Sequence, residues 1–389
     1  MIFESFSGAN QAVFITVFIS ALVMGAVANK TNFCTMGAVS DLVNMGMTGR
    51  LRAWVLAMAV ALIGVVVMES FGGVSFDITR PPYRSANFAW LEYLLGGFIF
   101  GIGMTLGSGC GHTTLIRLGG GNLKSIIVFS AIAVSAYFMV NPFPGSDKTL
   151  YSVLFYYWMS PLSASLTTPQ DLGSVFASML GTDKSGTRMW AGIIIAILML
   201  AYVFKARNFR KNYDNILAGF IVGLSVVVAW YASSSLVTIN MEDEAYSWVQ
   251  FASTDVWSMM AEGPQPRAVA IQSFTFINPT GETLGYIMSK FDSHYLTFGV
   301  IAVLGVLAGS FLWAVVSRKF RFEWFASFKD FVSHVIGGTL MGIGGVLALG
   351  CTIGQAITGI STLSMGSVLA FAGIFLGCYL TMKVQYYTL

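Results

Sequence analysis

Long apolar stretches recur along the whole of this 389-residue sequence and constrain its fold more than any other feature. A helix needs about 20 apolar residues to cross a bilayer, whose core has no water for unpaired backbone groups. Only 10% of the residues are charged, against about 25% in soluble domains. The sequence therefore predicts an all-α polytopic membrane protein. We expect about nine transmembrane helices, at residues 12–29, 52–71, 91–109, 122–140, 188–206, 214–236, 294–316, 331–349 and 366–386.

The distribution of lysine and arginine predicts how these helices are oriented. Cytoplasmic connections of membrane proteins carry an excess of basic residues. If the N-terminus lies outside, the inner connections hold 14 of the 21 Lys and Arg residues and the outer connections hold 7. We therefore expect an outside N-terminus and a cytoplasmic C-terminus. Residues 1–10 lack a basic region, so no cleavable signal peptide is expected.

A glycine-rich stretch that ends in Gly-Cys occurs twice. Residues 96–110 read GGFIFGIGMTLGSGC and residues 337–351 read GGTLMGIGGVLALGC, with eight identical positions and no gap. The same offset of 241 residues places Cys34 on Thr275 and Asp41 on Glu282. The chain therefore contains two copies of one unit. Because a single extra span, 188–206, separates two units with an even number of spans, the second copy is expected to be inverted.

We divide the chain accordingly into three parts. Residues 1–140 form the first transmembrane repeat. Residues 141–213 form an extracytoplasmic insertion and a linking transmembrane helix, and Thr168 is expected to cap a helix that begins at Pro169. Residues 214–389 form the second, inverted repeat, which has its own extracytoplasmic insertion at 238–272. A lid and a solvated loop both remain open as roles for the insertions.

Four segments, 31–50, 110–121, 273–290 and 350–363, are rich in Gly, Ser and Thr but too apolar for open loops. Such segments suit re-entrant structure, which is tolerated in a membrane where protein shields it or where it lines a watery cavity. Two would enter from each side. We expect them to meet near the middle of the membrane, where transporters with inverted repeats have their sites.

The four segments present three thiols and a hydroxyl, on Cys34, Cys110, Cys351 and Thr275. A neutral thiol is a weak donor and a soft acceptor, which suits a substrate that carries sulfur better than a hard cation or a sugar. Short helices after Cys110 and Cys351 would offer N-terminal N–H groups to an anion. We expect the following residues to line the substrate path: Cys34, Cys110, Cys351, Thr275, Asn32, Gly109, Gly111, His112, Thr113, Gly350, Thr352 and Gln355.

Other chemistry finds little support in the sequence. Cys378, in mid-helix without a repeat partner, is expected to be a small buried residue. His112 is near Cys110, but with only three histidines in the chain we expect a hydrogen-bonding wall residue instead of a metal ligand. There is no CxxC pair and no Walker A motif. We predict no catalytic residues, metal or cofactor, and no nucleic-acid partner.

The same motifs resemble those of the YeeE/YedE family of bacterial inner-membrane transporters of sulfur compounds. The resemblance rests on the Asn-Phe-Cys-Thr motif at 32–35 and on the two glycine-rich stretches, the second followed by Thr-Ile-Gly at 352–354. It implies nine spans, an hourglass shape with short helices at its narrow waist, and thiosulfate as substrate. It also implies that Cys34, Cys110 and Cys351 pass the ion along by hydrogen bonds without covalent capture.

The resemblance further implies a TusA-like cytoplasmic sulfur carrier as a partner and, for some family members, a link to selenium metabolism. Where family members often have an acidic residue between two glycines, this chain reads Gly-Gly-Gly at 119–121. We therefore expect an inner-membrane importer of thiosulfate or a related small sulfur oxyanion, and not an enzyme. Two alternatives stay open: a transporter of a selenium or other sulfur species, and a membrane sulfurtransferase that forms a Cys persulfide.

Overall fold

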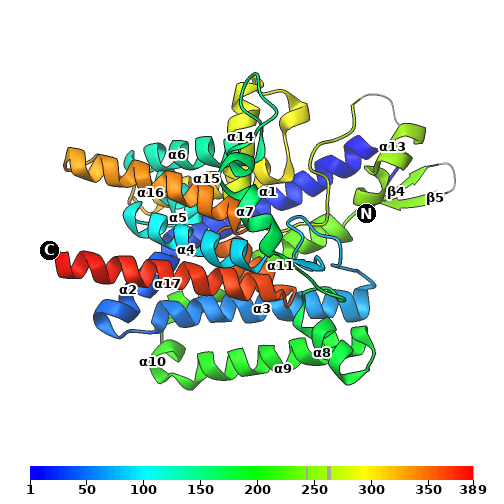
Figure 1. The fold of residues 1–389 in the computed structure, drawn as a ribbon, viewed down its shortest axis with the longest axis horizontal. Coiled ribbons are helices and arrows are strands. Elements are labelled where there is room, and N and C mark those ends of the chain that lie inside the picture. The colour runs from blue at the N-terminus through cyan, green and yellow to red at the C-terminus, as the bar shows by residue number, and fades with distance from the viewer. Residues whose placement is uncertain (242–243, 261–263, 389) are drawn as a thin grey trace.

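The computed structural model describes residues 1–241, 244–260 and 264–388. Long helices dominate it and run mostly along the long axis of the molecule (Figure 1). Within the described residues, eight helical stretches are long and apolar enough to cross a membrane. The protein is therefore an all-α polytopic membrane protein, as predicted.

The eight stretches correspond to eight of the nine predicted spans. Two of them, Phe6–Met45 and Trp90–Gly119, each join a long helix to a short one across a break. The predicted span 122–140 is present as α6 (Lys124–Val140), an apolar helix of 17 residues. The long helices are α1 (Phe6–Thr31), α3 (Gly49–Gly72), α4 (Trp90–Leu106), α9 (Lys184–Lys205), α11 (Tyr213–Ser234), α15 (Phe298–Val316), α16 (Phe328–Leu347) and α17 (Met365–Thr388).

Four short helical elements coincide with the four predicted re-entrant segments. They are α2 (Thr35–Met45), α5 (Gly111–Gly119), α14 (Ile277–Met288) and the π-helical η4 (Ile353–Gly359). The remaining elements lie in connections and insertions: β1 (Ile2–Phe3), β2 (Asn87–Phe88), η1 (Ser152–Tyr156), α7 (Tyr157–Met159), η2 (Ser160–Leu162), β3 (Ala164–Ser165), α8 (Leu172–Leu180), α10 (Arg207–Arg210), β4 (Thr238–Met241), β5 (Glu244–Ser247), α12 (Trp248–Phe251), α13 (Thr254–Met260) and η3 (Ser293–Tyr295). The strands form two small sheets, β1-β4-β5 and β2-β3.

Helices of the two halves of the chain pack in matched pairs. Helix α1 lies against α15, and α11 lies against α3; likewise α4 lies against α17, and α16 against α6. Gly101 and Gly342, which are equivalent in the repeat, make matching close contacts. A Cβ at Gly101 of α4 would lie 2.7 Å from the backbone nitrogen of Cys378 on α17, and one at Gly342 of α16 would lie 2.9 Å from the carbonyl oxygen of Ile132 on α6.

The two glycine-rich helices, α4 and α16, pack directly on each other. A Cβ at Gly96 would lie 2.5 Å from the backbone nitrogen of Ala348, and one at Gly103 would lie 2.7 Å from the carbonyl oxygen of Gly337. Gly96 comes before Gly103 in α4, whereas its partner Ala348 comes after Gly337 in the chain. The two helices therefore run antiparallel. The matched pairs and this antiparallel contact support our proposal of two inverted repeats.

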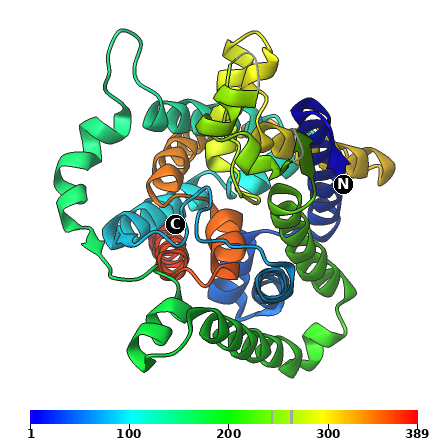
Figure 2. The ribbon, with the colours of Figure 1, turned by 90° about the vertical axis from the view of Figure 1, so that its right-hand side faces the viewer.

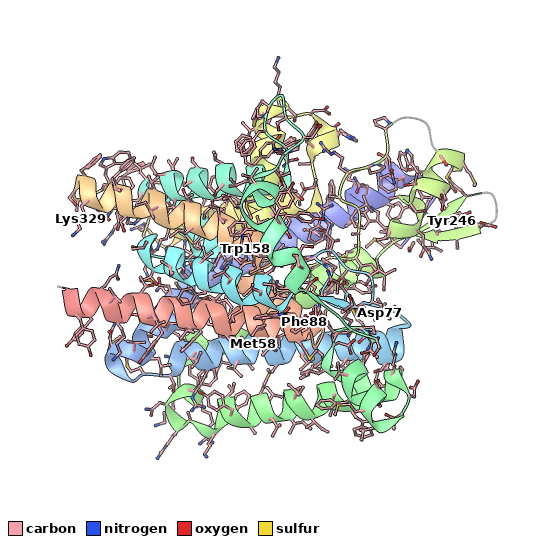
Figure 3. The ribbon with its side chains drawn as sticks, in the orientation of Figure 1. Met58, Asp77, Phe88, Trp158, Tyr246 and Lys329 are labelled. Carbon is pink, nitrogen blue, oxygen red and sulfur yellow. The ribbon has the colours of Figure 1, made fainter. Side chains whose placement is uncertain are left out.

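The two ends of the molecule are distinct. The N-terminus and the strands β4 and β5 lie at one end, and the C-terminus lies at the other (Figure 1). Asp77 and Tyr246 lie toward the first end and Lys329 at the second (Figure 3). We call these the N-terminal and C-terminal ends. Helix α9, which links the two halves, lies at the edge of the bundle in both views (Figure 2).

The helix expected at Pro169 begins later than predicted. Helix α8 begins at Leu172, and Asp171 is its N-cap, with a carboxylate oxygen that accepts a hydrogen bond from the Ser174 N–H at 2.8 Å. The Asp171 carboxylate is buried, and Arg188 of α9 compensates for the burial by donating hydrogen bonds to both of its oxygens, at 3.1 and 2.9 Å. A contact with a later helix therefore fixes the start of α8.

Candidate functional site

The two glycine-rich helices end in the same way. At the end of α4, the Gly109 N–H donates to the carbonyl oxygen of Met104 at 2.9 Å. At the end of α16, the Gly350 N–H donates to the carbonyl oxygen of Gly345 at 2.7 Å. This bond, which spans five residues, is typical of a Schellman closure, which stops a helix sharply. The chain therefore leaves each of the two helices directly before a cysteine.

The residue inside each closure is strained. Ser108 and Leu349, which are equivalent in the repeat, have left-handed backbone φ angles of 60° and 59°. Glycine is the usual residue at such a position, and a side chain there costs roughly 1–2 kcal/mol. The same strained turn in both copies holds Cys110 and Cys351 in equivalent positions, where one helix ends and a short one begins.

Two of the cysteines cap the short helices that follow them. Cys34 is the N-cap of α2, and its Sγ accepts a hydrogen bond from the Gly37 N–H at 3.4 Å. The Sγ of Cys351 accepts one from the Gly354 N–H at 3.5 Å. Ser, Thr, Asp or Asn usually takes this role. The sulfur atoms therefore lie where the helix N-termini direct their N–H groups.

The structure brings the three predicted thiols together. Cys110 lies near both Cys34 and Cys351. Its Sγ lies 3.3 Å from the Thr113 hydroxyl, which also reaches Cys34. The Thr275 hydroxyl lies 4.0 Å from the Sγ of Cys351. We call these five residues the thiol cluster.

A fourth thiol, that of Cys378, lies beside the thiol cluster and is buried, as the sequence predicted. Cys378 of α17 accepts a hydrogen bond from the Thr105 hydroxyl at 3.3 Å and lies near Cys34 and Cys110. An uninterrupted helix gave no sign of this position. Only the packing of α17 on the glycines of α4 reveals it.

A cavity opens on each side of the thiol cluster. Toward the C-terminal end, a cavity of about 530 Å³ is lined in part by Asn32, Ser108 and Arg117. Toward the N-terminal end, a cavity of about 210 Å³ is lined in part by Thr275 and Leu349. Because Ser108 and Leu349 are equivalent residues, the two cavities approach the two broken helix ends from opposite sides. We call them the inner and outer cavities.

Several buried polar atoms at this waist have no partner among the described residues. They are both ring nitrogens of His112, the hydroxyls of Thr35 and Thr352, and Oε1 of Gln355. An unpaired buried polar group costs about 1–3 kcal/mol, so these atoms are suited to bind water or a polar ligand. The ring of His112 lies beside Phe276, with 5.2 Å between the ring centroids, and its two unpartnered nitrogens remain available to water or a ligand, so the expected hydrogen-bonding role of His112 stays a prediction.

The three predicted glycines are all buried beside the cysteines. A Cβ at Gly111 would lie 2.8 Å from Cδ1 of Ile277, and one at Gly109 would lie 3.0 Å from Cγ2 of Thr113. A Cβ at Gly350 would lie 3.3 Å from the side-chain nitrogen of Gln355. The glycines therefore allow the short helices to pack closely against the broken ends of α4 and α16.

No motif or periodicity predicted that residues of the loop 73–89 belong to this site. The Tyr83 hydroxyl donates to the carbonyl oxygen of Gly354 at 2.7 Å, and Arg84 donates to that of Thr362 at 3.0 Å. Both side chains are buried. The loop therefore lies over η4, next to Cys351, and covers the waist on its N-terminal side.

Two cavities that converge from opposite ends on a waist with thiols define the class of this protein as a membrane transporter. The chain belongs to the sulphur transport family, whose model matches residues 30–380. This finding agrees with the resemblance predicted from the sequence.

Two curated relatives carry the name thiosulfate transporter TsuA. The one from Escherichia coli (strain K12) is 25% identical over 356 residues, which cover 88% of this chain and 87% of the relative. The one from Spirochaeta thermophila is 23% identical over 374 residues, which cover 93% of this chain and 96% of the relative. The similarity therefore extends over most of both chains.

Proposed function

We propose that this protein imports thiosulfate, or a closely related small sulfur oxyanion, across a bacterial inner membrane by way of the thiol cluster. One observation carries the proposal: Cys34, Cys110 and Cys351 lie together between two cavities in a chain of the sulphur transport family. The names of the two relatives favour thiosulfate among the possible sulfur anions.

The ion would pass from Cys351 to Cys110 and then to Cys34. Thr275, in the outer cavity, is the neighbour of Cys351, and Asn32, in the inner cavity, lies two residues before Cys34. Neutral thiols can donate S–H hydrogen bonds to the ion in succession. The helix N-termini and the unpartnered polar atoms would offset the loss of its hydration. No covalent bond forms in this scheme, so the protein is not an enzyme.

We propose an outside N-terminus, because the inner cavity is the more basic of the two. Its lining contains four basic residues, Arg117, Lys124, Lys319 and Arg321, against two acidic ones, Glu323 and Asp330, whereas the outer cavity has one of each kind. A cytoplasmic surface with an excess of basic residues follows the usual rule for membrane proteins. A TusA-like carrier, the partner implied by the family resemblance, would receive the ion at this face.

The test is uptake of thiosulfate by proteoliposomes that contain the purified protein. We expect Cys110→Ala to lower the initial rate by at least about tenfold, since a lost hydrogen bond to a charged group costs about 1.5–3 kcal/mol. Cys378→Ala is the matched control: it removes a buried thiol beside the cluster and should leave uptake within about twofold of the wild type. Undiminished uptake by Cys110→Ala would refute the proposed path.

Two further measurements separate the alternatives. Competition by unlabelled selenite, sulfate and thiosulfate ranks the substrates, and a stronger effect of selenite would assign the protein to selenium transport. A sulfurtransferase would leave a persulfide on Cys34, which mass spectrometry of protein incubated with thiosulfate detects as the mass of one added sulfur. We expect thiosulfate to compete best and Cys34 to stay unmodified.

A further inference from the structure

The outer cavity has two charged side chains in its lining, Arg80 and Glu282. Its volume of about 210 Å³ is several times the ~30 Å³ that one water molecule occupies in the liquid. The other lining residues are apolar or neutral, so Arg80 is the positive charge available to an anion in this space. Thr275 lies in the same lining and leads to Cys351.

Arg80 is held at the wall of the outer cavity. Its backbone N–H donates to the carbonyl oxygen of Ile271 at 2.9 Å, and its Nη2 donates to Oε1 of Glu282 at 3.2 Å. Half of the Arg80 side chain is exposed. Among the described residues, its guanidinium has no other hydrogen-bond partner, so several of its N–H donors remain free for an anion.

Glu282 would repel an anion if its charge were not offset. One of its oxygens faces Arg80, and the other accepts a hydrogen bond from the Thr297 hydroxyl at 2.5 Å. The carboxylate therefore keeps one partner even if Arg80 turns away. Asn278, whose amide oxygen has no hydrogen-bond partner among the described residues, lies in the same lining.

We infer that Arg80 captures the anion in the outer cavity and that Glu282 occupies its guanidinium until the anion arrives. This inference rests on the proposed function, because it assigns the first binding step of the same path. A guanidinium presents two parallel N–H groups that fit the oxygens of an oxyanion. The oxyanion end binds Arg80, and the terminal sulfur is left for Thr275 and Cys351.

The inner side contains the equivalent carboxylate, which is also paired with an arginine. Asp41 is equivalent to Glu282 in the repeat, and its Oδ2 lies 3.5 Å from Nε of Arg50. The Arg50 guanidinium lies against Gly37, in the first turn after Cys34: a Cβ at Gly37 would lie 2.7 Å from its Nη1. Both repeats therefore have an arginine with a carboxylate partner near a short helix, which argues against a chance pair at Glu282.

The test is the concentration dependence of thiosulfate uptake by proteoliposomes. We expect Arg80→Gln to raise KM about tenfold with little change in maximal rate, since Arg80 binds the ion before it reaches the waist. Raised ionic strength should increase the KM of the wild type more than that of the variant. Arg267→Gln is the matched control, because Arg267 belongs to a separate cavity near the same end and stacks on Tyr295 at 4.3 Å.

A second variant tests the role of Glu282 even if Arg80→Gln fails to fold. Glu282→Gln removes the competing charge, so we expect KM to fall by about threefold or more. An unchanged KM in Arg80→Gln, or a raised KM in Glu282→Gln, overturns the inference.

A binding measurement separates this inference from the proposed function. Thiosulfate should raise the Tm of the detergent-solubilised wild type, and Arg80→Gln should abolish the shift. Wild-type protein that shows the shift but no uptake would overturn the proposed import and support capture by Arg80. Normal uptake together with equal shifts in both proteins would overturn only the role of Arg80.

Discussion

At the scale of single residues, Cys34 has two roles that a substitution can separate: it caps a helix, and in the proposed path its thiol binds the ion. Cys34 caps α2 through its sulfur, and serine is a better N-cap than most residues. Cys34→Ser therefore keeps the helix start but replaces a soft sulfur by a hard oxygen. The position allows a test of whether softness or polarity matters in the path.

We expect Cys34→Ser to lower thiosulfate uptake nearly as much as Cys34→Ala, with a Tm equal to or above that of the wild type. The reason is that the hydroxyl preserves the cap, which contributes roughly 0.5–2 kcal/mol, but not the polarisable acceptor. Uptake by proteoliposomes and thermal unfolding in detergent check the two parts. Thr275→Ala should lower uptake less than either change. Full uptake by Cys34→Ser would mean that polarity alone suffices.

The sequence predicted which residues lie at the waist better than it predicted their contacts. The repeat offset linked Cys34, Cys110, Cys351 and Thr275, because equivalent positions of two copies meet near their common axis. It could not predict Tyr83 or Arg80, because a loop without periodicity has no sequence signal for where it folds back. It also could not predict that the ring of His112 packs beside Phe276, because only the structure shows this contact.

At the scale of elements, glycines decide how closely α4 and α16 approach. At Gly103, a Cβ would lie 2.7 Å from a backbone oxygen of the facing helix, and backbone cannot give way as a flexible side chain can. At Gly186 of α9, a Cβ would lie 3.6 Å from the nearest atom, the carboxylate oxygen of Asp183. An added methyl group would therefore clash with the facing backbone at Gly103 and find enough space at Gly186.

We expect Gly103→Ala to destabilise the protein by about 1–3 kcal/mol and to lower its Tm, because the methyl group forces the two central helices apart. Gly186→Ala, the matched control, should be neutral or slightly stabilising, because alanine loses less backbone entropy in a helix. Thermal unfolding in detergent provides the comparison. Equal Tm values for the two variants would show that the central contact tolerates an extra methyl group.

The elements themselves were predictable to different degrees. Hydropathy located the long helices, because a membrane span must be apolar along its whole length. The broken ends at Cys110 and Cys351 were also predicted, from the repeated Gly-Cys. The start of α8 was not, since Asp171 is bound by Arg188 and local sequence preferences cannot reveal a partner from another helix.

At the scale of the whole molecule, buried charges join the outer loops to the membrane-spanning helices. Arg188 of α9 bonds to Asp171 at the start of α8 and to Asp77 of the loop 73–89 at 2.7 Å. Arg84 of the same loop pairs with Glu69 of α3. This outer ion-pair cluster fixes the loop that carries Tyr83 and Arg80, and so it connects the peripheral helix α9 to the proposed path.

The pH dependence of stability tests this cluster through Asp77. Partial burial disfavours the charged carboxylate, but the hydrogen bond and charge of Arg188, with Arg84 adding to them, outweigh burial and lower the pKa of Asp77 below its usual 3.8. A carboxyl with a lower pKa in the folded state stabilises the fold above its unfolded pKa and loses that effect as the pH falls through the folded pKa. The contribution is therefore complete at pH 6 and lost progressively below about pH 4.

We expect Asp77→Asn to have a lower Tm than the wild type at pH 6, and the difference to shrink as the pH falls below about 4 toward the lowered folded-state pKa of Asp77. Asp147→Asn, a change in the outer insertion at a carboxylate without an ion pair among the described residues, should follow the wild-type curve throughout. Thermal unfolding in detergent across this pH range measures the difference. Parallel curves for wild type and Asp77→Asn would mean that Asp77 contributes no charge-dependent stability, and that Arg84 and Asp171 hold the outer loop without it.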